Sequence, residues 1–156
     1  MIPDEFWSRI RNVQKIHQHL YDSGKGWIIG WLILLLRHTG RKSGTEYATP
    51  LQYEKIGEDY CVGAGRGTRA NWFRNVQANP NVEVSVGRRH FKAVAEAVTD
   101  PERVADFLAY RLKRHPVMIG LMMKLHQLPM RPSREQLLEL AGKTALVVLH
   151  VIPEKE

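Results

Sequence analysis

The sequence predicts an α+β protein, mainly β, in which short strands form an antiparallel barrel with flanking helices. Residues 27–98 hold a series of closely spaced strand-like segments with only one short helix among them. This spacing favours an antiparallel barrel over alternating βαβ units. Helical patterns then fill residues 99–142, and an apolar, β-branched segment at 144–152 is expected to rejoin the sheet. The 156 residues contain no repeat or low-complexity linker, so we expect a single domain over residues 1–156.

The first expected element is a basic amphipathic helix over residues 4–21. Apolar side chains recur there on one helical stripe, and basic side chains surround it. The stripe consists of Phe6, Ile10, Val13, Ile16 or His17, and Leu20. We expect this helix to pack on the domain, and peripheral contact with a membrane surface is the alternative.

The strands of the barrel follow, each bounded by turn residues. Val82, Val84 and Val86 alternate with polar residues, which is typical of a strand with one buried face. The apolar run at 27–36 is about half the ~20 residues that span a bilayer, so it predicts a buried strand. In chain order the expected strands are Trp27–Arg37, Glu46–Lys55, Tyr60–Ala64, 82–86 and Arg89–Val98, and a short helix over Arg69–Ala78 interrupts them.

Two helix-start signals occur in the region 99–142. Thr99 followed by Glu102, and Ser133 followed by Gln136, have the spacing of a capping box. A glycine at 142 is a typical residue at a helix end. The expected helices therefore cover 99 to about 115, 117–126 and 133–142, and the final strand covers Thr144–Ile152.

The chain is basic, with a formal net charge of +7 alongside 44% hydrophobic and 25% charged residues. This composition is globular, and the charge indicates an anionic partner such as a phosphorylated cofactor, nucleic acid or an acidic membrane face. A single cysteine, Cys61, excludes an internal disulfide framework and a cysteine-based zinc site. Because the N-terminus is acidic and does not resemble a signal peptide, we expect a cytoplasmic protein.

Two turns contain the residues with the strongest chemical signal. The first, TGRKSG at 39–44, combines glycines with Arg41, Lys42 and Ser43, and such a turn can hold a phosphate or carboxylate. The alternative is a solvated basic hairpin. The second, at 61–75, reads CVGAGRGTRANWFRN and leads into a helix N-terminus, which also suits an anion. Thr68 stands where a dinucleotide fingerprint would have its third glycine, so a Rossmann site is disfavoured. We expect both loops to converge on one polyanionic ligand.

The ordered motifs between about Leu34 and Val98 resemble those of a known family. They are TGRKSG, a strand with TPL, the glycine-rich turn, the helix NWFRN, then ANP and VEVSVG. This series resembles the deazaflavin (coenzyme F-420)-dependent nitroreductase family of oxidoreductases, which have a split β-barrel, FMN-binding-like fold. The resemblance implies binding of coenzyme F-420 and hydride transfer from its reduced form to quinones, nitro compounds or other electron-poor acceptors. It also suggests a homodimer, because split barrels of this kind often pair.

The resemblance assigns cofactor-binding roles to four groups of residues. The first loop would hold the phosphate and acidic tail with Arg41, Lys42, Ser43 and Gly44. The next strand would line the ring with backbone groups of Thr49, Pro50 and Leu51. The second loop would close over the phosphate and ribityl region with Ala64, Gly65, Arg66 and Gly67. The helix would pack against and orient the cofactor with Trp72 and Asn75.

The chain departs from the family pattern after Val98, where it reads YRLKRHPVMIGLMMKLHQLPMRP from residue 110. Tyr110 is the nearest candidate for a proton donor in this segment. Four methionines, at 118, 122, 123 and 130, are expected to fill the core or, alternatively, to face a lipophilic acceptor. His115 and His126 have no metal-ligand spacing and no evident acidic partner, so we expect surface residues and no metal site.

Three alternatives remain open at the level of sequence. The same barrel could bind FMN, which shares a tricyclic ring and a ribityl phosphate with the deazaflavin. It could also be a non-catalytic carrier of an apolar ligand such as a fatty acid or haem. Nucleic-acid binding ranks last, because the basic loops lack aromatic residues at stacking spacing apart from Trp72 and Phe73.

Overall fold

The computed structural model describes residues 33–154, and seven strands in this range form one curled antiparallel sheet. Its strand order is β2-β1-β5-β6-β7-β4-β3. The mainly β prediction is therefore confirmed. The strands are β1 (Ile33–Thr39), β2 (Glu46–Gln52), β3 (Glu54–Ile56), β4 (Asp59–Ala64), β5 (Asn81–Val86), β6 (Arg89–Val98) and β7 (Ala145–Val151).

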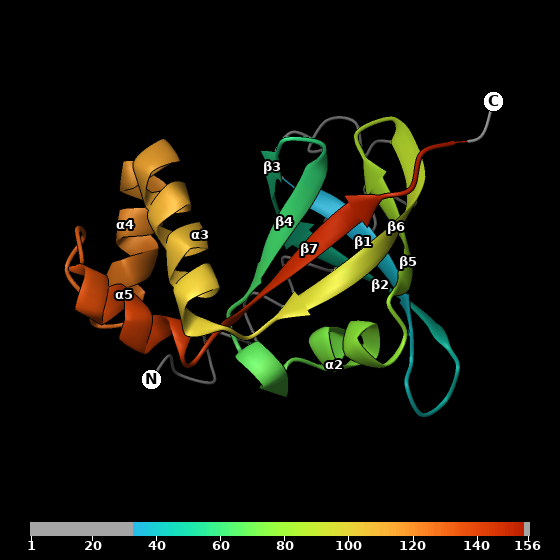
Figure 1. Cartoon of the computed structure of the whole chain (residues 1–156), viewed down its shortest axis with the longest axis horizontal. Coiled ribbons are helices and arrows are strands. Elements are labelled where there is room, and N and C mark those ends of the chain that lie inside the picture. The colour runs from blue at the N-terminus through green and yellow to red at the C-terminus, as the bar shows by residue number, and fades with distance from the viewer. Residues whose placement is uncertain (1–32, 155–156) are drawn as a thin grey trace.

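The helices lie in two places around the sheet. Figure 1 shows α3, α4 and α5 grouped beside the sheet, while α2 lies across its lower end. Their bounds are η2 (Gly67–Arg69, a short 3₁₀ turn), α2 (Asn71–Ala78), α3 (Pro101–Arg114), α4 (Pro116–Leu125) and α5 (Arg134–Ala141). The expected helix at 4–21, and the expected strand residues 27–32, lie outside the described residues.

Two apolar cores hold these layers together. The concave face of the sheet buries alternate residues such as Leu34, Leu36 and Val62, and Phe73 of α2 closes this core from below. Between the convex face and the three-helix layer lies a second core, which contains Cys61 and the fully buried Met123. Burial raises the pKa of the Cys61 thiol to about 11, so this cysteine stays protonated and unreactive.

Two expected boundaries were wrong. The continuous strand Glu46–Lys55 is two strands, because β2 pairs with β1 while β3 pairs with β4. Since β2 and β3 form opposite edges of the sheet, residues 52–54 carry the chain from one edge to the other. The helix expected from Arg69 begins at Asn71, because Ala70 has an extended backbone.

The start of α3 was also misplaced. Its N-cap is Asp100 and not Thr99, and the Asp100 carboxylate accepts a hydrogen bond from the Glu102 N–H at 3.3 Å. Pro101 explains the shift, because proline favours the first helical position and so places the cap directly before it. The Ser133–Gln136 capping box is present as predicted.

A buried charge cluster joins the helical layer to the edge of the sheet, and it corrects the expectation for His115. The carboxylate of Glu54, only 4% exposed, lies 2.8 Å from His115 Nε2 and 3.5 Å from Arg111 Nε. Arg114 reaches the same carboxylate at 3.5 Å. His115 therefore does have an acidic partner, one that is 61 residues distant in sequence and was not recognisable from spacing. His126 is half-buried at the end of α4.

Candidate functional site

The first basic loop is a tight hairpin between β1 and β2. The Gly40 N–H donates to the Thr45 carbonyl at 2.7 Å, and the Gly44 N–H donates to the Gly40 carbonyl at 3.0 Å. A Cβ on Gly40 would lie 2.7 Å from Ser43 Oγ and 2.9 Å from a ring atom of Tyr47, so a larger residue there would displace these two side chains. The side chains of Arg41, Lys42 and Ser43 are exposed at the tip.

The second basic loop, residues 64–70, is also held in one conformation. Gly67 has a φ of +57°, and a Cβ there would lie 3.0 Å from the Lys143 carbonyl oxygen. Glycine is therefore required both by the backbone and by the close approach of the chain before β7. The Arg74 Nε donates to the Thr68 carbonyl at 2.7 Å, which ties the loop to α2.

Helix α2 connects the two loops. The backbone N–H and Nη1 of Arg41 donate to Asn75 Oδ1 at 3.2 and 2.8 Å. The same guanidinium reaches the side chain and carbonyl of Asn71, the first residue of α2, at 3.4 and 3.5 Å. The first loop thus contacts α2, the helix that directly follows the second loop in the chain. Figure 1 shows α2 between η2 and the β1–β2 hairpin.

A directed chain of hydrogen bonds continues from this contact into the sheet. Because Asn75 Oδ1 accepts from Arg41, the Asn75 amide nitrogen is the donor to His38 Nδ1 at 3.2 Å. The other imidazole nitrogen, Nε2, then carries the proton and donates to Thr49 Oγ1 at 2.8 Å. The hydroxyl hydrogen of Thr49 is left to donate to another group.

Burial fixes the charge state of the imidazole in this chain. His38 is 4% exposed, and desolvation lowers its pKa from 6.5 to about 4. The ring is therefore neutral at physiological pH, as the donor and acceptor pattern requires. It also stacks on Tyr47 with ring centroids 5.9 Å apart.

The electrostatics of the two loops favour an anion. Taken with the adjoining ends of β1 and β4 and with α2, the loops cover residues 37–45 and 60–78. These residues contain six Arg or Lys and no Asp or Glu. Within the described part of the chain, the exposed side chains of Lys42 and Arg69 make no ion pair or hydrogen bond. These two cations are available to a ligand, whereas Arg41 is already engaged as the link to α2.

The other predicted cofactor-binding residues differ in how deeply they are buried. The side chains of Leu51 and Ala64 are in the concave core, so only their backbone groups are free to contact a ligand. Trp72 is half-buried and packs edge-on against Phe73 at 6.2 Å. At the surface, the predicted set contributes Gly44, Gly65 and Arg66, while Pro50 and Gly67 are buried.

Tyr110 is not part of this network. It lies near the C-terminal end of α3, with the Arg114 guanidinium 5.7 Å from its ring centroid. The next residue, Arg111, contacts Gln52 at the end of β2 that is away from the hairpin, and Glu54 on β3. A role for Tyr110 at the loops has no support in these contacts.

Sequence reasoning missed His38, Asn71 and Arg74. His38 carried a usable signal, because it follows Leu34 and Leu36 at the strand period of two and so had to be a buried polar residue with partners. Asn71 and Arg74 carried no such signal in the sequence. Their contacts, with Arg41 and with the Thr68 carbonyl, form only in the folded chain.

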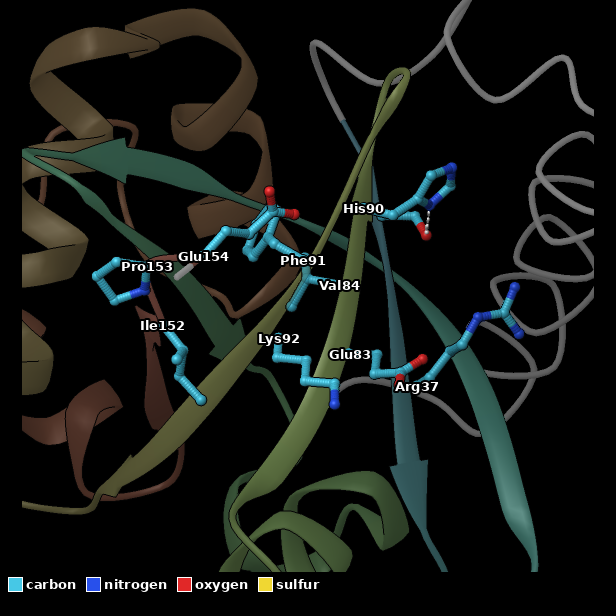
Figure 2. A pocket seen from close by; sticks show the side chains of 10 residues that line it. Arg37, Glu83, Val84, His90, Phe91, Lys92, Ile152, Pro153 and Glu154 are labelled. Atoms are coloured by element: carbon cyan, nitrogen blue, oxygen red, sulfur yellow. Dashed lines mark hydrogen bonds between the residues drawn. The ribbon is translucent and has the colours of Figure 1, made fainter. Parts of the chain in front are cut away.

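An open groove of about 450 Å³ lies over the β5–β6 hairpin, and Figure 2 shows its lining. The groove contains none of the predicted cofactor residues. Charges of both signs line it, and Ser85 Oγ is 2.8 Å from His90 Nδ1 within it. The lining residues are Arg37, Glu83, Val84, Ser85, His90, Phe91, Lys92, Ile152, Pro153 and Glu154.

Residues 33–154 contain neither a metal-binding cluster nor a membrane-spanning helix. No group of three or more His, Cys, Asp or Glu side chains in this range could hold a metal ion. No helix in the same range is long and apolar enough to cross a membrane.

The chain has relatives in sequence and in structure. An F420H(2)-dependent quinone reductase of Mycobacterium tuberculosis is 36% identical over 74 residues, which are 44% of this chain and 50% of the relative. The chain thus matches about half the length of this curated relative. Two solved structures are each 20% identical and share the fold. One is an F420-H2 dependent reductase with a TM-score of 0.52, covering 76% of this chain and 93% of its own. The other is described as a domain-swapped dimer, with a TM-score of 0.56, covering 95% and 100%.

These likenesses confirm the predicted split β-barrel fold. A family model described as F420H(2)-dependent quinone reductase matches residues 9–117, which include both basic loops and all of α2. That match spans well over half of the chain and agrees with the resemblance found in the ordered motifs from 34 to 98. The chain belongs to the F420H(2)-dependent quinone reductase family.

Proposed function

We propose that the protein binds coenzyme F-420 and is an oxidoreductase that passes hydride from the reduced cofactor to a quinone or another electron-poor organic acceptor. The observation that carries the proposal is the contact of Arg41 with Asn71 and Asn75, which brings both acid-free basic loops onto one helix. Family membership and the related quinone reductase of M. tuberculosis support the same activity.

The donor set fits an anionic cofactor. Lys42 and Arg69 offer two exposed positive charges from different loops, and Gly65 is exposed in the second loop, whereas the Gly44 N–H is already bonded within the hairpin. Charge-assisted bonds of this kind suit a phosphodiester and a carboxylate tail. When bound, coenzyme F-420 supplies the ring carbon that carries hydride, so the protein itself needs no nucleophile.

The chain's own contribution is binding, orientation and exclusion of water. Arg41 and Asn75 hold the first loop, while Arg74 holds the second against the same helix. His38 stays neutral and fixes the rotamer of Thr49 through its Nε2–H. The Thr49 hydroxyl is thereby set as a hydrogen-bond donor on β2, next to the loop that would hold the phosphate.

The direct test is binding followed by turnover. Titration of the purified protein with coenzyme F-420, FMN and haem, each followed by absorbance or fluorescence, should give the tightest binding for coenzyme F-420. Addition of a soluble quinone or nitroaromatic to the reduced complex should then restore the oxidised cofactor spectrum. Tighter binding of FMN or haem, or binding of coenzyme F-420 without turnover by any acceptor, would refute the proposal.

We further propose a cytoplasmic homodimer. The support for the dimer is a structural neighbour described as a domain-swapped dimer, whose fold covers 95% of this chain, and the cytoplasmic location stays a prediction. Light scattering after size exclusion should give twice the monomer mass. Contact of the expected N-terminal helix with a membrane falls on residues outside the described range, and it stays a prediction.

A further inference from the structure

Helix α4 is apolar on all sides and yet lies at the surface. Among its ten residues, PVMIGLMMKL, only Lys124 has a charged or hydrogen-bonding side chain. A helix of this composition in a globular protein is normally buried all round. Here four large apolar side chains are exposed: Val117 by 65%, Leu121 by 54%, Leu125 by 47% and Met118 by 40%.

The exposed side chains form one continuous face. At about 100° per residue, positions 117, 118, 121 and 125 fall within roughly a quarter to a third of the helix circumference. The opposite side packs inward with Ile119 and Met123, which are 1% and 0% exposed. Gly120 lies against Met130, whose methyl carbon would be 2.9 Å from an added Cβ. The helix is therefore firmly seated, and its outer face is free within the described part of the chain.

The helix and the segments that flank it in the sequence are basic. Residues 107–134 contain six Arg or Lys and no Asp or Glu. Three of these cations are paired with carboxylates: Arg111 and Arg114 with Glu54, and Arg134 with Glu102. The other three, Lys113, Lys124 and Arg131, are exposed and make no ion pair among residues 33–154.

We propose that α4 and its basic flanks form a surface that docks on an anionic lipid bilayer, with the helix lying in the plane of the interface. Apolar side chains on one face and cations near them are the features of an interfacial helix that binds an anionic membrane. A second copy of the chain fits less well, because a symmetric contact would bring Lys113, Lys124 and Arg131 of both copies together. This surface is independent of the cofactor loops and does not rest on the proposed function.

The test is co-sedimentation of the full chain with phosphatidylcholine vesicles, prepared with and without phosphatidylglycerol. The wild-type protein should bind the anionic vesicles more tightly, and added salt should weaken binding. Leu121→Glu should weaken binding to anionic vesicles by about tenfold, because it places a charge in the apolar face. The matched control is Ile56→Glu on β3, a residue that is 39% exposed, and it should bind as the wild type does.

A second variant keeps the proposal testable if Leu121→Glu fails to fold, as judged by circular dichroism. Lys124→Glu with Arg131→Glu leaves the apolar face intact and should remove the preference for anionic vesicles. The proposal is overturned if wild-type protein ignores phosphatidylglycerol, or if the folded variants bind as tightly as the control. It is equally overturned if Leu121→Glu converts a dimer to a monomer and leaves vesicle binding unchanged.

Discussion

His38 shows how one buried polar residue organises the candidate site. It lies between the amide of Asn75 and the hydroxyl of Thr49, and each of its ring nitrogens has one partner. A neutral imidazole is the side chain that can accept on one side and donate on the other in this geometry. The chain from Arg41 to Thr49 therefore has a fixed direction, and the loop conformation and the Thr49 rotamer depend on each other.

The pH dependence of folding should report the burial of His38. Its pKa is about 4 in the folded protein and about 6.5 when unfolded, so between these values the unfolded chain holds a proton that the folded chain does not. Stability should therefore fall as the pH drops from 6.5 towards 4, by up to about 3 kcal/mol. Urea unfolding at a series of pH values measures this loss.

The control is a His38→Asn variant, which cannot titrate at this position. Other groups contribute in both proteins, including His150, whose hydrogen bond to Glu96 raises its pKa and favours folding at low pH. These contributions cancel in the difference between wild type and variant. Equal pH dependence of the two proteins would mean that His38 is not buried as described.

At the scale of elements, the conformation of the second loop depends on the packing of β7 behind it. Gly67 and Gly57 both have a positive φ, of +57° and +63°. An added Cβ meets the Lys143 carbonyl at 3.0 Å in the first case and nothing within 4 Å in the second. Gly57→Ala should cost about 1 kcal/mol of unfolding free energy, and Gly67→Ala clearly more. Urea unfolding of both variants checks the order, and equal losses would contradict the close approach.

The buried cluster around Glu54 should dominate the attachment of α3 and α4 to the sheet. Burial lowers the pKa of the Arg111 guanidinium, and Glu54 opposes this effect by stabilising the charge. Glu54→Ala leaves that charge buried without its carboxylate, which should cost about 3–5 kcal/mol. Glu58→Ala, at an exposed position in the next turn, should cost less than about 0.5 kcal/mol. Chemical denaturation of the two variants would contradict this reading if their losses were similar.

The sequence predicted the elements whose pattern is local. Strands β5, β6 and β7 have alternating or β-branched residues between clear turns, and they occur within about one residue of the expected bounds. The division of β2 from β3 was not predictable, because EYATPLQYEKI has no breaker where the chain changes edges. That change is set by pairing with β1 on one side and β4 on the other.

The same contrast holds for the candidate site. Glycine and arginine composition identified both loops, since their chemistry is visible within a few residues. The partners that hold them were not visible, because Arg41 is 34 residues from Asn75, and His38 is 37. Nothing local marks such pairs, and only the position of α2 under the sheet brings them together.

At the scale of the whole molecule, the basic surplus lies in two separate surfaces. One comprises the two loops around α2 at the lower end of the sheet, and the other is the α4 region of the helical layer (Figure 1). Each surface is free of acidic residues over the segments that form it. A split barrel can thus present a basic site for an anionic cofactor and, on a separate surface, a face that docks on a membrane.

The measurement that tests the central claim most directly is titration of coenzyme F-420 into two single variants, Lys42→Ala and Arg69→Ala. If both loops hold one ligand, each variant should weaken affinity by about tenfold, because each loses one charge-assisted contact. Lys55→Ala, which removes the same charge from β3, should bind as the wild type does. Wild-type affinity in either loop variant would show that the two loops do not share a ligand.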